Sequence, residues 1–212
     1  MTTAVRAIVY ANVGAFVITL IAPGLMMGVL GLSPEAVLTQ GRLWQPATYL
    51  FVHGGVFHLL WNMLAVWMFG VELEQRWGTE AFVRYYAVVG IGAGVCVVAA
   101  SFLPFAAARD SYYAVTIGAS GAVYGLLMAW GIIFPHRTVL FFGIFPLTAR
   151  VFVLLLGAVS FAQAASAGGG TTVSHLAHLG GLAAGWWYLK TPNPRPRPRP
   201  PTPRPTHLRR VH

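Results

Sequence analysis

The stretch that decides the fold and the candidate site is Gly118-Ala119-Ser120-Gly121-Ala122-Val123-Tyr124-Gly125. It places one serine among small residues at the start of an apolar run. A serine in such a run commonly bonds to the backbone of its own helix and has no further role. Two other apolar runs also begin with polar residues, His58 and Asn62 in one and His178 in the other. These residues favour a second interpretation, in which Ser120 is a nucleophile.

The composition of the whole chain is that of a membrane protein. Of its 212 residues, 57% are hydrophobic and only 9% are charged, which is far from the balance of a soluble globule. The net charge of +9 is concentrated near one end, because seven of the fourteen Lys and Arg lie at or after Lys190. The others are scattered singly between apolar runs, as topology signals are. We therefore expect contacts with membrane lipid and no nucleic acid partner.

Six apolar runs predict an all-α, polytopic bundle of six transmembrane helices. They cover roughly residues 7–30, 56–71, 81–103, 117–134, 148–165 and 173–189. The first run has the alternative of a signal peptide, but its length and the lack of a cleavage site favour a retained span. Starting the fifth run at Thr148 keeps Arg150 at the interface, where its charge can reach water. Residues 139–147 would then lie along the membrane surface.

Residues 1–190 are expected to form one domain, followed by a Pro/Arg-rich tail over residues 191–212. The tail cannot bury a core and should be extended or disordered. It either touches anionic lipid headgroups or docks a partner that reads proline motifs. Between the first two spans, Trp44, Tyr49 and several prolines suit an interfacial loop.

The positive residues orient the bundle. If both termini are cytoplasmic, twelve of the fourteen Lys and Arg lie inside, and only Arg42 and Arg109 lie outside. The second, fourth and sixth spans then run inward, and their polar residues should each lie roughly 5–10 Å below the outer edge of their own helix. Polar groups on three helices at one membrane depth mark a functional site.

These polar residues have the chemistry of a serine–histidine dyad. His178 is the candidate base that takes the proton of Ser120, and Tyr124, one turn after Ser120, can stack on its ring. A carboxylate to complete a triad is lacking, because the acids lie in outer loops or on the cytoplasmic side. These acids are Glu35, Glu72, Glu74, Glu80 and Asp110.

Donors for a developing oxyanion are also present. His58 and Asn62 are four residues apart, on one face of the second span. The backbone N–H of Ser120 at a helix N-terminus adds a third donor. His53, shortly before, belongs to the same polar patch.

Glycines should let the fourth and sixth spans approach closely. Gly121 and Gly125 on one helix, and Gly181 and Gly185 on the other, have the small-xxx-small spacing of close helix pairs. This spacing favours His178 as the base over His175, which lies three residues earlier. A zinc site made of His53, His58, His175 and His178 is an alternative, but carboxylate and thiolate ligands and an HExxH motif are lacking. We expect no metal and no other cofactor.

Taken together, these motifs resemble those of the rhomboid family of intramembrane serine proteases, over about residues 5–190. Gly118-Ala119-Ser120-Gly121 followed by Tyr124 resembles the nucleophile motif, and Ala177-His178 with its two following glycines resembles the base motif. His53, His58 and Asn62 match the second-span pattern. Glu74-Gln75-Arg76-Trp77-Gly78 resembles a turn of the family, and Trp44 its first-loop tryptophan. Position 45 is Gln where some members have Arg, which leaves the contacts of that loop open.

The resemblance implies a six-span bacterial member in the inner membrane, with both termini cytoplasmic. Its activity would be hydrolysis of a peptide bond in or beside the transmembrane helix of single-span membrane protein substrates. Gly118, His58, Asn62 and Tyr124 would support the dyad, and the fifth span would act as a lateral gate. Residues 166–170, which are rich in glycine and lie over the outer end of the site, are expected to form a mobile cap. Two alternatives are an inactive client-binding relative, which would lack the serine or histidine, and a transporter, which would show internal repeats.

Overall fold

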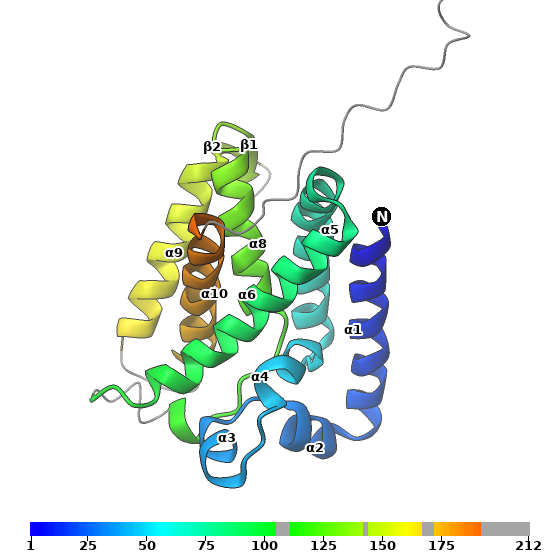
Figure 1. The fold of residues 1–212 in the computed structure, drawn as a ribbon, viewed down its shortest axis with the longest axis vertical. Coiled ribbons are helices and arrows are strands. Elements are labelled where there is room, and N and C mark those ends of the chain that lie inside the picture. Colours follow the sequence, from blue (N-terminus) through cyan, green and yellow to red (C-terminus); the bar gives the residue numbers. More distant parts are fainter. Residues whose placement is uncertain (105–110, 142–143, 167–171, 192–212) are drawn as a thin grey trace, which may run out of the picture.

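A computed structural model describes residues 1–104, 111–141, 144–166 and 172–191. Long helices run side by side, with short helices gathered at one end (Figure 1). The long ones are α1 (Thr3–Ile21), α5 (Val56–Trp77), α6 (Thr79–Ala100), α8 (Ser120–Ile133), α9 (Ala149–Ala165) and α10 (Thr172–Lys190). The short ones are α2 (Pro23–Leu25), the π-helical turn η1 (Met26–Leu30), α3 (Pro34–Gln40), α4 (Gln45–Thr48) and the 3-10 turn η2 (Tyr49–Phe51). The prediction of an all-α membrane bundle is confirmed.

The helices differ in how far they can reach across a bilayer. Among the described residues, α1, α5 and α6 are long and apolar enough to span it, while α8 and α9 are apolar but have only 14 and 17 residues. Large apolar side chains such as Ile21, Phe57, Trp61 and Phe161 are more than 60% exposed. In a membrane these side chains face lipid, which removes the cost that their exposure would have in water.

The ends of three predicted spans were wrong by several residues. The first helix begins at Thr3 and ends at Ile21, because Ala22 leaves the helical conformation before Pro23. The second continues six residues beyond Val71, since Glu72 and Glu74 accept hydrogen bonds from other helices rather than ending α5. The third predicted span, residues 81–103, corresponds to α6, which begins at Thr79 and ends at Ala100.

The fifth helix begins near the residue that the sequence indicated. Thr148 caps α9, and its hydroxyl oxygen accepts a hydrogen bond from the N–H of Val151 at 3.4 Å. The segment before it was expected only to follow the membrane surface. Instead β1 (Thr138–Phe141) and β2 (Phe145–Thr148) form an antiparallel hairpin in which Thr138 pairs with Thr148. Its β-branched and aromatic residues favour a strand over a helix.

The segment between the first two long helices is structured rather than a simple interfacial loop. Tyr49 and Gln45 are fully buried, so the expectation that Tyr49 marks an interface was wrong. The side-chain oxygen of Gln45 accepts a hydrogen bond from the N–H of Ser33 at 3.0 Å, and Trp44 donates to the carbonyl of Val29 at 2.8 Å. A glutamine at position 45 therefore holds this loop together through uncharged hydrogen bonds.

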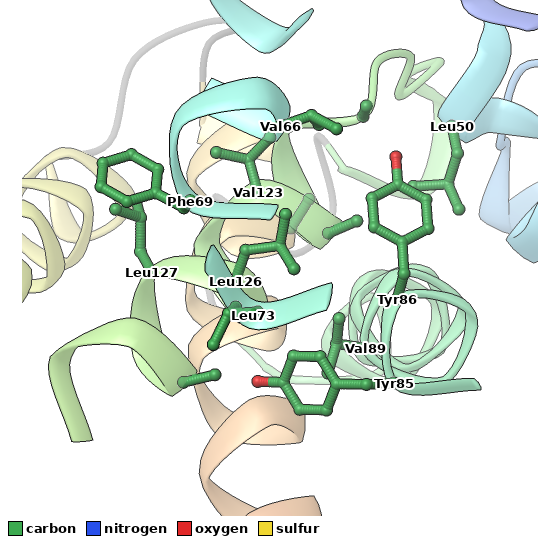
Figure 2. Close-up of a cluster of buried hydrophobic side chains, with 14 of the residues drawn as sticks. Leu50, Val66, Phe69, Leu73, Tyr85, Tyr86, Val89, Val123, Leu126 and Leu127 are labelled. Carbon is green, nitrogen blue, oxygen red and sulfur yellow. The ribbon is translucent and has the colours of Figure 1, made fainter. Parts of the chain in front are cut away.

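The core is formed by α5, α6 and α8. Figure 2 shows their side chains meeting in one buried cluster, with Val66, Phe69 and Leu73 from α5, Tyr85, Tyr86 and Val89 from α6, and Val123, Leu126 and Leu127 from α8. The α5 residues recur every three or four positions, which places them on one helix face. α10 packs against α6, α8 and α9, so it is enclosed on several sides.

The structure also shows which ends of the helices lie together. The N-terminus, the β1–β2 hairpin and the end of α10 lie at one end of the bundle, and α2, α3 and α4 lie at the other (Figure 1). The beginning and the end of the helical domain are thus on the same side, as an even number of spans requires.

Glu74, near the end of α5, holds the first helix in place. Its carboxylate is buried and accepts hydrogen bonds from the N–H groups of Ala4 and Val5, both at 3.0 Å. It also accepts one from the hydroxyl of Thr79 at 2.8 Å. Helix N-terminal N–H groups lack partners within the helix and attract negative charge, so a side chain from another helix caps α1.

We expect Glu74→Ala to lower the free energy of unfolding by about 1.5–3 kcal/mol, the range for hydrogen bonds to a charged group. Thermal unfolding of the purified protein in detergent measures this loss. Glu80→Ala is the matched control, because the Glu80 side chain is 88% exposed and forms a surface ion pair with Arg84, an arrangement that contributes little. Equal melting temperatures for Glu74→Ala and wild type would show that α1 does not depend on this contact.

Candidate active site

The short length of α8 puts Ser120 below one membrane face if the hairpin end of the helix lies at the other. Ser120 is the first residue of α8, and the other end of that helix leads to the β1–β2 hairpin. Fourteen residues extend about 21 Å, so a helix that ends at one face of a hydrocarbon core of about 30 Å stops roughly 10 Å short of the other face. Ser120 would lie at this depth because it is the first residue of a helix too short to cross the hydrocarbon core.

The sequence-based depth estimate was therefore wrong in its reasoning. The fourth span was expected to begin near Ile117 and to carry Ser120 some way along it, but Ser120 is its first residue. His58 is the third residue of α5, less than one turn from its start. Asn62 and His178, each the seventh residue of its helix, lie more than one turn within α5 and α10.

The chain that leads to Ser120 is not helical, and its backbone is bonded to the rest of the protein. Leu32 and Thr116 exchange two backbone hydrogen bonds, of 2.9 and 2.8 Å. The N–H of Gly118 donates to the carbonyl of Tyr49 at 2.9 Å. Non-helical backbone at membrane depth is tolerated only where protein or water satisfies its polar groups. These contacts let α8 begin inside the bilayer.

Gly118 and His58 meet directly before the serine. Gly118 has φ +108°, a conformation that disfavours any other residue. A side chain there would also collide with the imidazole of His58, since a Cβ would lie 2.5 Å from its Nε2. Gly118 thus lets the His58 ring lie against the turn that presents Ser120.

His53 and Asn62 complete this side of the site. Nε2 of His53 accepts a hydrogen bond from the N–H of Ala119 at 3.4 Å, so this nitrogen carries no proton. Asn62 is buried, and its amide donates one hydrogen to the carbonyl of His58 at 2.8 Å. A primary amide has a second hydrogen, which this bond leaves available.

On the other side, His178 lies flat against Tyr124. The ring centroids are 4.1 Å apart and the planes differ by 5°. Tyr124 is one turn after Ser120, so the stack holds the imidazole beside the start of α8. Gly121, next to Ser120, would place a Cβ 3.4 Å from the carbonyl oxygen of Ala177, next to His178. The two backbones that carry the candidate nucleophile and base are thus in contact.

The rival histidine and the carboxylates are placed differently. His175 contacts His178 edge-on, with ring centroids 5.5 Å apart, and no stack with Tyr124 is found for it in the described residues. Glu72 bonds to Trp130 at 2.9 Å and pairs with Arg137 at 3.4 Å, beyond the middle of α8 and towards the hairpin. Nδ1 of His178 is buried without a hydrogen-bond partner in the part of the chain that the structure describes.

The glycines of α8 and α10 allow the closest helix contact in this region. A Cβ at Gly181 would overlap the carbonyl oxygen of Gly121, and one at Gly185 would lie 3.2 Å from the carbonyl oxygen of Gly125. Gly92 of α6 likewise faces Ala184 of α10. The contact of Gly181 with Gly121 sets the spacing between the two helices at the level of Ser120.

Gly181→Ala should therefore both destabilise the protein and impair the site. The added methyl meets backbone rather than a flexible side chain, so the helices must separate, at a cost of about 1–3 kcal/mol typical of overpacking. Thermal unfolding measures the loss. Gly14→Ala is the matched control, since a Cβ there meets nothing within 4 Å. A melting temperature for Gly181→Ala equal to that of Gly14→Ala would contradict the proposed close contact.

Two side chains that position the site were not predicted from the sequence. The carbonyl of Tyr49 accepts a hydrogen bond from the N–H of Gly118, and its hydroxyl donates one to the carbonyl of Gly90 at 2.9 Å. Ser160 of α9 donates to the hydroxyl of Tyr124 at 3.2 Å. Ser160 was detectable only as the single hydroxyl in the middle of an apolar run. The proposed cap, residues 166–170, lies outside the described residues except for Ser166, as does Asp110.

The geometry defines a class of protein: a polytopic helical membrane protein with polar side chains from three helices meeting at the start of a short, buried helix. Comparison with known proteins identifies the family, since residues 40–192 match the rhomboid domain. The chain belongs to the rhomboid family, and the recognition made from its motifs is confirmed.

Individual relatives support the same assignment. The chain is 32% identical over 142 residues to "Rhomboid protein 1, mitochondrial" of Saccharomyces cerevisiae, covering 66% of this chain and 40% of that protein. It is 27% identical over 157 residues to "Rhomboid protease GluP" of Bacillus subtilis, covering 73% and 27%. It is 31% identical over 156 residues to "RHOMBOID-like protein 4" of Arabidopsis thaliana, covering 73% and 35%.

The matches thus span well under half the length of these relatives. They come from a bacterium, a yeast mitochondrion and a plant, so membership of the family supports an integral membrane protein but not the bacterial inner membrane expected above.

Proposed function

We propose that this protein is an intramembrane serine endopeptidase that cleaves membrane protein substrates by a dyad of Ser120 and His178. The observation that carries the proposal is the stack of His178 on Tyr124, one turn after Ser120. It holds an imidazole against a ring one helical turn from Ser120, which supports the pairing of the two residues.

The reaction follows from the positions of these groups. Ser120 Oγ attacks the carbonyl carbon of the scissile peptide bond while His178 takes its proton. The resulting oxyanion is stabilised by the Ser120 N–H, which has no partner within the helix, and by the side chains of His58 and Asn62. His178 then protonates the leaving amine. In the second half, His178 takes a proton from the attacking water and returns it to Ser120 Oγ as the new carboxyl product leaves.

The same proposal covers domain organisation and orientation. Residues 1–190 would form the protease domain and residues 191–212 a cytoplasmic Pro/Arg-rich tail. The end of the bundle with the N-terminus and the hairpin would face the cytoplasm, because most of the Lys and Arg are there. The start of α8 would then open towards the outer face of the membrane.

The proposed mechanism limits which substrates can be cut. A peptide carbonyl in an intact helix is bonded to a backbone N–H and screened by side chains, so attack requires a locally unwound segment. Gly or Pro near the outer end of a substrate helix lowers the cost of unwinding. The glycine-lined space near Ser120 favours a small residue just before the cut.

We expect purified protein in liposomes to cleave single-span substrates near the outer face, next to a Gly/Pro pair. Mass spectrometry maps the cut sites, and moving the pair by one helical turn should move them with it. Replacing the pair by Leu should suppress cleavage. Cuts near the cytoplasmic face, or unchanged cutting through an all-Leu helix, would contradict the mechanism. Capture of substrates without cleavage would instead indicate an inactive, client-binding relative.

A further inference from the structure

Ser160 is a buried hydroxyl on an otherwise apolar helix. Ser160 is only 1% exposed, whereas its neighbours Val159 and Phe161 are 53% and 66% exposed. A hydroxyl buried in a membrane protein is costly unless it forms a hydrogen bond. Ser160 forms one across helices, since its Oγ donates to the phenolic oxygen of Tyr124 at 3.2 Å.

That bond reaches the ring on which His178 lies. The rings of Tyr124 and His178 are parallel within 5°, at a centroid distance of 4.1 Å. A ring held only at its Cβ can tilt, but a hydrogen bond at the opposite end of the phenol restricts the tilt. Ser160, Tyr124 and His178 thus connect α9, α8 and α10 in series.

Two other contacts of the buried side of α9 are apolar and lie closer to the hairpin. A Cβ at Gly131 of α8 would meet Val153 at 3.0 Å, and one at Gly157 of α9 would meet Leu182 at 3.2 Å. Ser160 lies further along the same face, level with Tyr124. A movement of α9 away from α8 at this level breaks the hydrogen bond, while apolar contacts nearer the hairpin can persist.

We propose that Ser160 is a positioning residue, which couples the seating of α9 against α8 to the orientation of the His178 ring. The proposal rests on the proposed role of His178 as the base. It means that the dyad is fully aligned only while α9 is docked, so that the chemical step depends on a helix that contributes no reacting atom.

The kinetic test uses hydroxyl deletions on both sides of the bond. A neutral hydrogen bond corresponds to about two- to tenfold in a rate. Ser160→Ala and Tyr124→Phe should each lower kcat by about this factor, with KM unchanged. The double variant should lose no more than either single one, because both remove the same bond. Ser160→Thr, which keeps the hydroxyl, should restore kcat, and Val159→Ala on the lipid-facing side should match wild type.

A second measurement does not depend on activity. The Tyr124 ring shifts the carbon-bound proton signals of the stacked His178 ring in NMR spectra of histidine-labelled protein, and His178→Gln identifies those signals by their loss. In Ser160→Ala they should move towards the positions of an unstacked histidine, and in Ser160→Thr they should return.

The outcomes separate this proposal from the proposed function. If wild type cleaves substrate and Ser160→Ala does so with the same or a higher kcat, the positioning role is overturned while the protease assignment stands. If wild type cleaves nothing, the protease assignment fails, and the NMR signals alone decide whether Ser160 orients His178. Unchanged His178 signals in Ser160→Ala overturn the proposal in either case.

Discussion

Ser120→Ala and His178→Ala are each expected to abolish cleavage of a membrane substrate, by roughly 10⁴-fold or more. The first variant removes the nucleophile and the second removes the base. A serine without a base is a weak nucleophile, and a base without the serine has nothing to activate. The double variant should be no less active than either single variant, because the two residues act as a unit. Initial rates of cleavage in liposomes measure the loss, and unchanged melting temperatures would show that it is not due to unfolding.

His175→Ala is the matched control for the base. His175 lies one turn before His178 on the same helix and contacts it edge-on, but it does not share the stack with Tyr124 in the described structure. We expect His175→Ala to keep most of its activity. An inactive His175→Ala beside an active His178→Ala would show that the base has been assigned to the wrong histidine.

The second large effect is expected at the oxyanion donors. His58→Ala or Asn62→Ala should lower kcat by about 10²–10³, the range for loss of a single donor. The backbone N–H of Ser120 remains in both variants and keeps the residual rate above that of the dyad variants. The matched control is Leu60→Ala, because Leu60 is on the same helix, half-exposed, and turned away from the polar cluster. Wild-type rates in both donor variants would remove α5 from the chemistry.

The two donors should differ in a way that the geometry explains. Asn62 also donates to the carbonyl of His58, so its loss frees a backbone acceptor near the start of α5. His58 lies against Gly118, where it limits the movement of the turn that presents Ser120. We therefore expect His58→Ala to raise the mobility of this turn as well as to lower the rate, which hydrogen exchange of the Gly118 and Ala119 amides measures.

Much of the architecture could be predicted from the order of polar and apolar residues. Apolar runs of near-membrane length must become helices in lipid, because no other structure satisfies each backbone group within a single segment. The positions of Ser120, His58, Asn62 and His178 at the starts of such runs then suggested that they meet. The glycines at i and i+4 of two helices indicated which faces pack, because only a residue without a side chain allows that approach.

Helix boundaries were less predictable, since they depend on partners that are distant in the sequence. Hydropathy suggested that the second span ends before Glu72, but α5 continues because Glu74 accepts hydrogen bonds from the start of α1, about seventy residues earlier. Likewise, an apolar segment before Ser120 looked helical. It is not helical, because Leu32 pairs with Thr116 and the carbonyl of Tyr49 accepts the N–H of Gly118.

The sequence alone determined that this is a helical membrane protein of the rhomboid family, with a serine and a histidine on helices that pack through glycines. Only the tertiary structure decided that Ser120 is the first residue of its helix, that His178 rather than His175 lies on Tyr124, and that Ser160 of α9 reaches the same ring. The physical reason is that hydropathy and spacing act within one helix, whereas these three features depend on hydrogen bonds and ring contacts between helices that no local pattern specifies.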